Sequence, residues 1–204
     1  MPAYWPRAKR ALARRDAVMG GIMRCHPRIA LRTRGDAFQT LARAIVGQQI
    51  SVKAADSVWS KVAQVSPTMR PAEIAQARRD RLLAAGLSQR KAEYLYDLAQ
   101  RFCAGTLHPA RWAGMDDESI VDELTQVRGI GRWTAEMFLM FHLLRPDVLP
   151  LDDLGLRKAV YIHYGGGDHV PNDDIRMLAQ DWAPWRSVAT WYLWRSLDPV
   201  PVEY

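Results

Sequence analysis

Two neighbouring carboxylates, Asp152 and Asp153, are the side chains of this sequence that are best placed to do chemistry. They follow Leu149-Pro150, and the residue before a proline favours extended backbone, so an extended segment should deliver them to the start of a helix over 154–164. An aspartate in this place ordinarily caps the first N–H groups of the helix. An ionised carboxylate held there could also stabilise positive charge that develops on a bound molecule. Taken alone, the pair is explained by capping.

The second chemical feature is the glycine-containing turn at residues 127–131, Val-Arg-Gly-Ile-Gly. Its two glycines permit a tight hairpin that a Cβ would obstruct, and Ile130 can be buried between the flanking helices. The helix expected from Arg132 would direct its first N–H groups and its positive dipole end toward a phosphate oxygen. Such backbone contacts do not depend on base sequence. The surrounding LTQVRGIGRWTA favours a helix–hairpin–helix over a chance turn, and no strand precedes it, as a dinucleotide fingerprint would require.

The elements that must position these features are helices almost throughout, because apolar residues recur at helical spacing and no convincing alternating strand is found. Asp36, Ser51, Ser88 and Asp116 or Asp117 are the expected N-caps. We expect an all-α protein of about ten helices. The clearest ones are predicted at 37–49, 51–65, 71–77, 88–102, 117–127, 132–144, 154–164, from Pro171, and at 185–197.

Composition excludes several classes of protein. No apolar run is long enough to cross a bilayer, and the N-terminal segment has no apolar signal core, so secretion by that route is not expected. Two distant cysteines cannot build a four-thiolate zinc or iron–sulfur site, and a reducing compartment is expected. Histidine pairs with metal-ligand spacing and serine or cysteine nucleophile motifs are not found.

The charge is concentrated at the start of the chain. The net charge is +6, and residues 1–34 hold nine lysines or arginines and a single acid, Asp16, so the rest is slightly acidic. A basic face of this kind can meet phosphate. A solvated helix surface explains the same residues equally well.

Four motifs in this order resemble those of the helix–hairpin–helix DNA glycosylases, most closely the DNA-3-methyladenine glycosylase II branch. They are AIVGQQIS at 44–51, GIGRWTA at 129–135, LPLDDLG at 149–155 and WAPWRSVATWYLW at 182–194. The resemblance runs from about residue 16 to residue 195 and implies the compact form without an N-terminal β domain.

The family fold implies two helical subdomains that flank a cleft. One would be formed by 37–145 and carry the helix–hairpin–helix at about 117–143. The other would be formed by 1–36 with 146–204 and carry the catalytic aspartate.

The resemblance assigns Asp153 as the catalytic carboxylate and leaves Asp152 a structural role. A glycosylase swings its target base out of the duplex, and cleavage of the N-glycosidic bond develops oxocarbenium-like charge on the sugar. Asp153 would stabilise that charge and orient or activate the attacking water. Relatives that also cut the strand use a lysine where this chain has Trp133, which cannot form a Schiff base. The expected activity is therefore hydrolytic removal of alkylated purines, of the 3-methyladenine and 7-methylguanine type, without lyase activity.

A base pocket is expected from aromatic residues, because electron-rich indole faces attract cationic alkylated purines. Met137 stands where some relatives have tyrosine, which leaves the substrate range open. Trp185 and Trp191 are interpreted as core residues. The residues assigned to the pocket by the resemblance are Trp133, Met137, Trp194 and Gln48.

Gln49 corresponds to the wedge position that fills the gap left by the extruded base, and Gln48 would contact DNA or line the pocket. A simple cap of a solvent-facing turn by both glutamines stays open as the alternative.

Two kinds of contact are expected at the hairpin, of which the second rests on the resemblance alone. The DNA backbone would be bound by Gly129, Ile130, Gly131, Arg132 and Thr134. A monovalent cation, Na⁺ or K⁺, would be held by the backbone carbonyls of Thr125, Val127 and Gly129, and no other cofactor is required.

The expected partner is double-stranded DNA that contains alkylated bases, bound by a monomer without any membrane association. The protein would then work at the nucleoid of a bacterial cytoplasm or in a eukaryotic nucleus. Two other functions fit parts of the sequence. A non-catalytic helix–hairpin–helix DNA-binding protein would have no need of Asp153. A glycosylase for oxidised or mismatched bases is disfavoured by the missing lysine and the missing iron–sulfur cysteines.

Overall fold

The computed structural model describes residues 1–33 and 36–197, and every regular element in these ranges is a helix. The all-α prediction is thus confirmed. The described residues form two compact units, one of 1–33 with 139–197 and the other of 36–138. The chain passes between them inside a helix, at 138–139, whereas the sequence analysis placed the division at 145–146. The reason is that Phe141, near the end of that helix, packs against Trp191 and Trp194 of the first unit.

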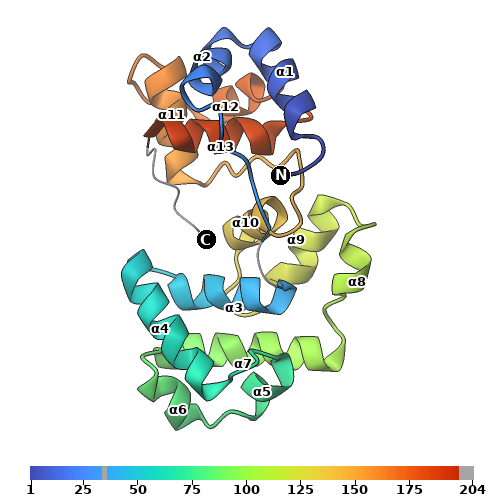
Figure 1. Cartoon of the computed structure of the whole chain (residues 1–204), viewed down its shortest axis with the longest axis vertical. Coiled ribbons are helices and arrows are strands. Elements are labelled where there is room, and N and C mark those ends of the chain that lie inside the picture. Colours follow the sequence, from blue (N-terminus) through green and yellow to red (C-terminus); the bar gives the residue numbers. More distant parts are fainter. Residues whose placement is uncertain (34–35, 198–204) are drawn as a thin grey trace. The chain divides into compact units, whose positions relative to one another are not determined.

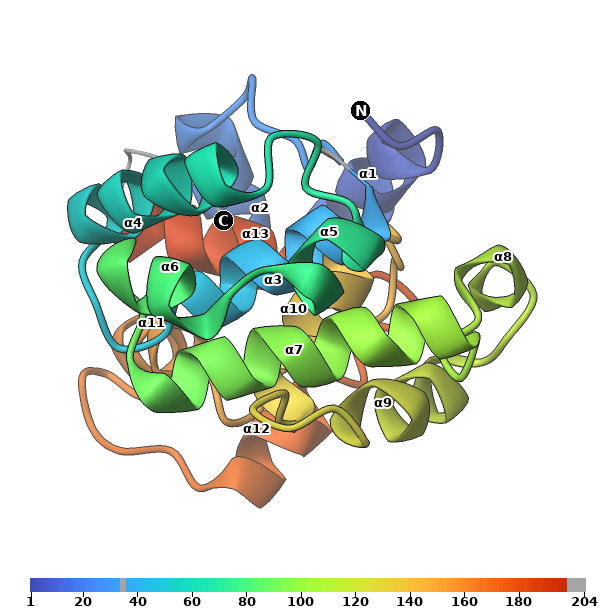
Figure 2. The ribbon, with the colours of Figure 1, turned by 90° about the horizontal axis from the view of Figure 1, so that it is seen from below.

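The unit of 36–138 is arranged around its longest helix, α7 (Gln89–Ala104), which packs against α3 (Ala37–Gly47) and α5 (Pro71–Gln76). Figure 2 shows α7 lying alongside these two helices. Apolar residues of α3 and α7 are fully buried against one another. The unit also contains α4 (Val52–Val65), α6 (Arg79–Ala84), α8 (Pro109–Trp112), α9 (Asp117–Thr125) and most of α10 (Arg132–Phe141).

An aromatic chain extends this core toward α10. Phe38, Phe102, Trp112 and Phe138 meet successively edge to face, with ring centroids 5.3, 6.4 and 5.2 Å apart. Edge-to-face contacts of this kind add to the free energy of burial. They hold the first turns of α10, and with them the end of the hairpin, against the helical core.

The other unit is built around α13 (Arg186–Leu197), whose residues are buried on almost every side. It packs against α1 (Trp5–Arg15), α2 (Ala17–Cys25) and α11 (Leu154–Tyr164), as Figure 1 shows. The short helix α12 (Asn172–Leu178) completes the unit. A helix that is buried on almost every side has no single amphipathic stripe, and it needs such a cover from several neighbours.

Several predicted element boundaries are confirmed and others shift. Asp36, Ser51, Ser88 and Asp116 cap α3, α4, α7 and α9 through their side-chain oxygens. Helix α3 ends at Gly47 instead of 49 because Gln48 is extended and Gln49 has a left-handed φ of 57°. Helices α1, α2, α6 and α8 were not predicted individually. No helix in the described part of the chain has the length and apolarity that a bilayer crossing needs.

Asp16 joins α2 to the core of its unit. Its Oδ1 accepts the N–H of Met19 at 2.9 Å, which caps α2. Its Oδ2 accepts the Tyr164 hydroxyl at 2.6 Å and the Trp182 indole N–H at 3.0 Å. Burial and this carboxylate raise the pKa of Tyr164 far above its usual value. The acid of the basic N-terminal segment therefore has a structural role.

Replacing Asp16 by alanine should cost more stability than an ordinary cap deletion. The cap itself is worth about 1 kcal/mol, and each of the two donors left without an acceptor costs about 1–3 kcal/mol. We expect a loss of roughly 3 kcal/mol or more in the free energy of unfolding, measured by urea denaturation. Asp36→Ala, which removes the side-chain cap of exposed Asp36, is the matched control and should lose only about 1 kcal/mol. Equal losses would contradict the bridging role of Asp16.

Candidate active site and hairpin

Asp153 is the N-cap of α11, as its sequence context indicates. Its Oδ1 accepts the N–H of Leu156 at 2.7 Å, and the residue is only 9% exposed. The indole Nε1–H of Trp194 donates to the same oxygen, also at 2.7 Å. The carboxylate is therefore both a cap and the acceptor of a tryptophan 41 residues away. Two donors on one oxygen fix its orientation, whereas a cap alone would leave the carboxylate freer to rotate.

Gly155 makes this close approach of indole and carboxylate possible. A Cβ at this position would lie 3.0 Å from Cδ1 of Trp194 and 3.1 Å from Oδ1 of Asp153, distances that are tighter than ordinary van der Waals contact. The indole cannot retreat easily, because Trp194 stacks on Phe141 at 5.9 Å and meets Trp191 edge to face at 6.3 Å. The glycine of LPLDDLG thus has a packing reason that the sequence alone did not show.

Trp185 and Trp191 belong to the core of their unit, as the sequence indicated. Trp191 is buried in the core of its unit, and Trp185 packs against that core and stacks on Tyr4. Trp133 is half-buried and Met137 is buried, one turn apart on α10. A role for Trp133, Met137 and Trp194 in binding a base stays a prediction.

The hairpin between α9 and α10 depends on Gly129, as the sequence indicated. Its φ of 85° is left-handed, and a Cβ there would lie 2.2 Å from the ring of Tyr94 on α7. Only glycine therefore fits, for both backbone and steric reasons. Ile130 is buried, and Gly131 accepts the N–H of Ala135 to begin the hydrogen bonding of α10. A carboxylate of α7, Asp97, accepts the N–H of Arg128 at 2.8 Å and holds the turn from the other side.

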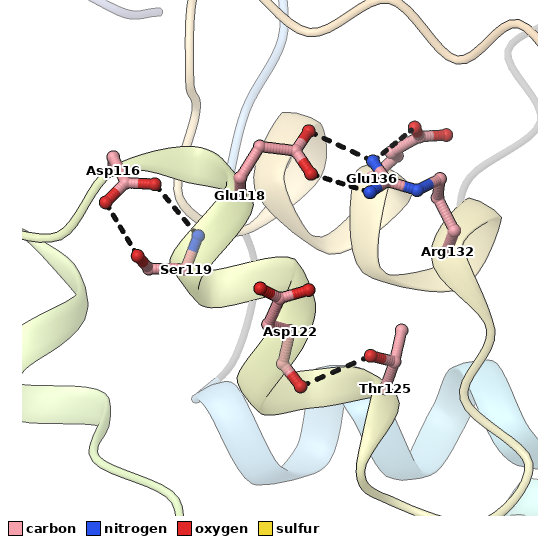
Figure 3. A network of polar contacts seen from close by, with 7 residues as sticks. All are labelled: Asp116, Glu118, Ser119, Asp122, Thr125, Arg132 and Glu136. Atoms are coloured by element: carbon pink, nitrogen blue, oxygen red, sulfur yellow. Dashed lines mark hydrogen bonds and ion pairs between the residues drawn. The ribbon is translucent and has the colours of Figure 1, made fainter.

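The side chain of Arg132 lies in an ion-pair network between α9 and α10 (Figure 3). Its two terminal nitrogens donate to the carboxylate of Glu118 at 3.0 and 2.6 Å, and Glu136 lies at 3.7 Å. The bidentate hydrogen bond raises the pKa of Arg132 and lowers that of Glu118. This guanidinium therefore joins the two helices of the hairpin. Thr134 is buried in the next turn. DNA-backbone contact by residues 129–134 stays a prediction.

Gln48 turns toward the hairpin. Its Nε2 donates to the carbonyl of Gly129 at 2.8 Å. Lys91 of α7 donates to the carbonyls of Val46 and Gln48, each at 2.7 Å. Burial lowers the pKa of this lysine. Gln49 is exposed beyond this anchored residue. No role was predicted for Lys91, Tyr94 and Asp97, although their spacing of three residues places them on one face of α7.

The predicted carbonyl set for a monovalent cation is partly engaged within the protein. The carbonyl of Val127 accepts the N–H of Ile130, and that of Gly129 accepts Gln48. A carbonyl oxygen has two lone pairs, so these contacts are compatible with a cation at Thr125, Val127 and Gly129. Within the described residues, no group of three or more His, Cys, Asp or Glu side chains could hold a metal ion.

Comparisons with known proteins give one consistent result. The profile of the HhH-GPD superfamily of base excision DNA repair proteins matches residues 42–185. The chain is similar to DNA-3-methyladenine glycosylase 1 of Schizosaccharomyces pombe, at 34% identity over 78% of this chain and 72% of that protein. It is also similar to DNA-3-methyladenine glycosylase 2 of Escherichia coli, at 32% identity over 92% of this chain and 67% of that protein.

Two solved structures share the fold closely. The DNA-3-methyladenine glycosidase of Bacillus halodurans superimposes with a TM-score of 0.85 at 32% identity, over 95% of this chain and 89% of that one. A 3-methyladenine DNA glycosylase of S. pombe, in complex with abasic DNA, superimposes with a TM-score of 0.78 at 27% identity, over 93% of this chain and 96% of that one.

The contact between Trp194 and Asp153 can be tested by Gly155→Ala. Alanine is normally the better helix residue, but here its Cβ should push the indole from the carboxylate. We expect faster solvent exchange of the Trp194 Nε1–H proton, by several-fold for a weakened hydrogen bond, measured by NMR and assigned with Trp194→Phe. Gly114→Ala is the matched control, because a Cβ there meets only an ordinary contact at 3.8 Å. Unchanged exchange in Gly155→Ala would contradict the close packing.

Proposed function

The chain belongs to the HhH-GPD superfamily of base excision DNA repair proteins, and we propose that it is a DNA glycosylase that removes alkylated purines from duplex DNA by hydrolysis. The single observation that carries the proposal is the carboxylate of Asp153, fixed at the start of α11 by Leu156 and Trp194. The names of the relatives from S. pombe, E. coli and B. halodurans support the substrate class.

The chemistry follows from the position of this carboxylate. The target nucleotide must first leave the base stack, since its glycosidic bond cannot be reached inside the duplex. When the bond breaks, the base leaves with the bonding electron pair, and positive charge develops on the sugar. The Asp153 carboxylate stabilises this charge. A water molecule then adds to the sugar carbon and loses its proton to Asp153 or to solvent, which leaves an abasic site.

An N-alkylated purine such as 3-methyladenine or 7-methylguanine is a good leaving group without protonation by the enzyme. Its ring is already positively charged, so the departing base becomes neutral without general acid catalysis. The indole of Trp194, whose N–H donates to Asp153, would attract such a cation. Because no general acid is needed, a single catalytic carboxylate is sufficient for this reaction.

The DNA-binding part of the proposal rests on the hairpin and the loop after α3. The backbone of 129–134 would bind a phosphate at the start of α10, and Gln49 would fill the gap in the duplex. A Na⁺ or K⁺ ion held by the carbonyls of Thr125, Val127 and Gly129 would add positive charge near that phosphate. No step of the hydrolysis requires it.

Asp153→Asn tests the catalytic assignment. Asparagine keeps an oxygen that can accept from Leu156 and Trp194, so the fold should persist while the negative charge is lost. We expect base release from methylated duplex DNA to fall by about a hundredfold or more, with affinity for abasic-analogue DNA within a few-fold of wild type. Released bases are identified by chromatography.

Asp152→Asn is the neighbouring control and should keep most of the activity. Near-normal release by Asp153→Asn would remove the catalytic assignment. DNA binding without any base release by the wild-type protein would favour the non-catalytic DNA-binding alternative.

The absence of a lysine at position 133 predicts base removal without strand cleavage. The product strand should remain intact until alkali is added, and borohydride should trap no covalent protein–DNA adduct, because Trp133 cannot form a Schiff base. Denaturing gel electrophoresis measures both results. An adduct trapped during turnover would show that another amine supplies lyase chemistry.

A further inference from the structure

We propose that Gln48 is a positioning residue that ties the loop of the wedge residue Gln49 to the phosphate-binding hairpin, so that both act on DNA as one rigid element. This inference rests on the proposed function. It replaces the pocket or DNA-contact role that the sequence suggested for Gln48 with a contact inside the protein.

The first observation is the hydrogen bond between two loops that are 81 residues apart in sequence. The Nε2 of Gln48 donates to the carbonyl of Gly129 at 2.8 Å. Gly129 itself has little freedom to move, because its backbone lies directly against the ring of Tyr94. The amide of Gln48 is therefore anchored to the most constrained residue of the hairpin, which immediately precedes Ile130 and the start of α10.

The second observation is that the main chain of Gln48 is held as well as its side chain. Lys91 donates to the carbonyls of Val46 and Gln48 at 2.7 Å, where α3 ends. A cation is favourable at a helix C-terminus, where carbonyls lack partners within the helix. With both its amide and its carbonyl engaged, Gln48 has little room to rotate or shift.

The third observation is the conformation of the next residue. Gln49 has a φ of 57°, which is uncommon for a residue other than glycine, and its side chain is exposed. Such strain persists only where the surroundings determine the backbone. The hydrogen bonds of the Gln48 side chain and carbonyl fix the backbone at this point. They therefore hold the exposed side chain of Gln49 in one direction.

A single helix face supports both loops. Lys91, Tyr94 and Asp97 follow one another at intervals of three residues on α7. They contact the end of α3, Gly129 and Arg128, respectively. Both the wedge loop and the hairpin are therefore supported by α7. The hydrogen bond from Gln48 to Gly129 connects the two loops directly.

Rigidity of this kind has a mechanical purpose. Extruding a paired base costs free energy in lost stacking and pairing. The contacts of the protein with DNA must offset this cost. A wedge that is held in a fixed position relative to the bound phosphate loses none of that binding free energy to rearrangement of its own loop. A loop that yielded would let the base stay in the stack. The tie should therefore matter most for a base that is fully paired.

Gln48→Met tests this role, because methionine keeps the length of the side chain and removes the N–H donors. Single-turnover excision is measured on 7-methylguanine in a fully paired duplex and on the same lesion left unpaired in a bulge. We expect about a tenfold loss on the paired substrate, as for one lost hydrogen bond in the transition state, and less than threefold on the bulge. Gln64→Met, at an exposed glutamine of α4, should match wild type on both substrates.

Two other outcomes overturn the inference. An equal loss on both substrates would place Gln48 in the base pocket. No loss on either would make it only a cap of the turn. A wild-type protein that excises neither substrate would instead refute the proposed function, and the tie is then judged by the measurement of amide exchange below.

Amide hydrogen exchange measures the coupling between the two loops independently of enzymatic activity. In Gln48→Met, amides of both 48–52 and 128–131 should exchange several-fold faster, while the melting temperature stays close to that of wild type. Faster exchange confined to 48–52 would show that the two loops are independent. Lys91→Met should loosen the same two loops, and the double variant should be little worse than the more affected single variant, because coupled contacts are not additive.

Discussion

The candidate active site depends on the presence of a carboxylate that is almost buried yet remains well solvated by the protein. Removing a charged group from water is costly unless hydrogen bonds replace the lost hydration. Asp153 receives them from the first turn of α11 and from the indole of Trp194, on the same oxygen. The positive end of the helix dipole acts in the same direction. The carboxylate is therefore held in one orientation, as the proposed electrostatic stabilisation of a cationic transition state requires.

The hydrogen bond between Trp194 and Asp153 accounts for the types of the residues packed around it. Gly155 leaves space for Trp194, and Phe141 and Trp191 hold the indole from two sides. Phe141 and Trp191 thus hold Trp194 in the position from which it donates to Asp153. The N–H lies at the ring edge and the π-system at the ring face, so the hydrogen bond to Asp153 leaves the face of the indole for its aromatic neighbours. Base binding by the same indole stays a prediction.

The hairpin unit shows how internal pairing limits the charges available to a partner. Arg132 is engaged with Glu118 and Glu136, and Lys91 with backbone carbonyls. Part of the basic N-terminal segment is used in the same way, since Lys9 and Arg15 donate to carbonyls of their own unit. The net charge of the chain is therefore a poor guide to its binding surface.

What the sequence determined by itself is local. Helix periodicity, the capping residues, the left-handed turn at Gly129 and the N-cap position of Asp153 all follow from interactions within a few residues, so they could be predicted. The tertiary structure decided the pairings between distant residues, such as Trp194 with Asp153 and Gln48 with Gly129. A donor of this kind has many possible acceptors in the unfolded chain. Only the packing of α13 beside α11, and of α3 beside α7, brings one of them within hydrogen-bonding distance.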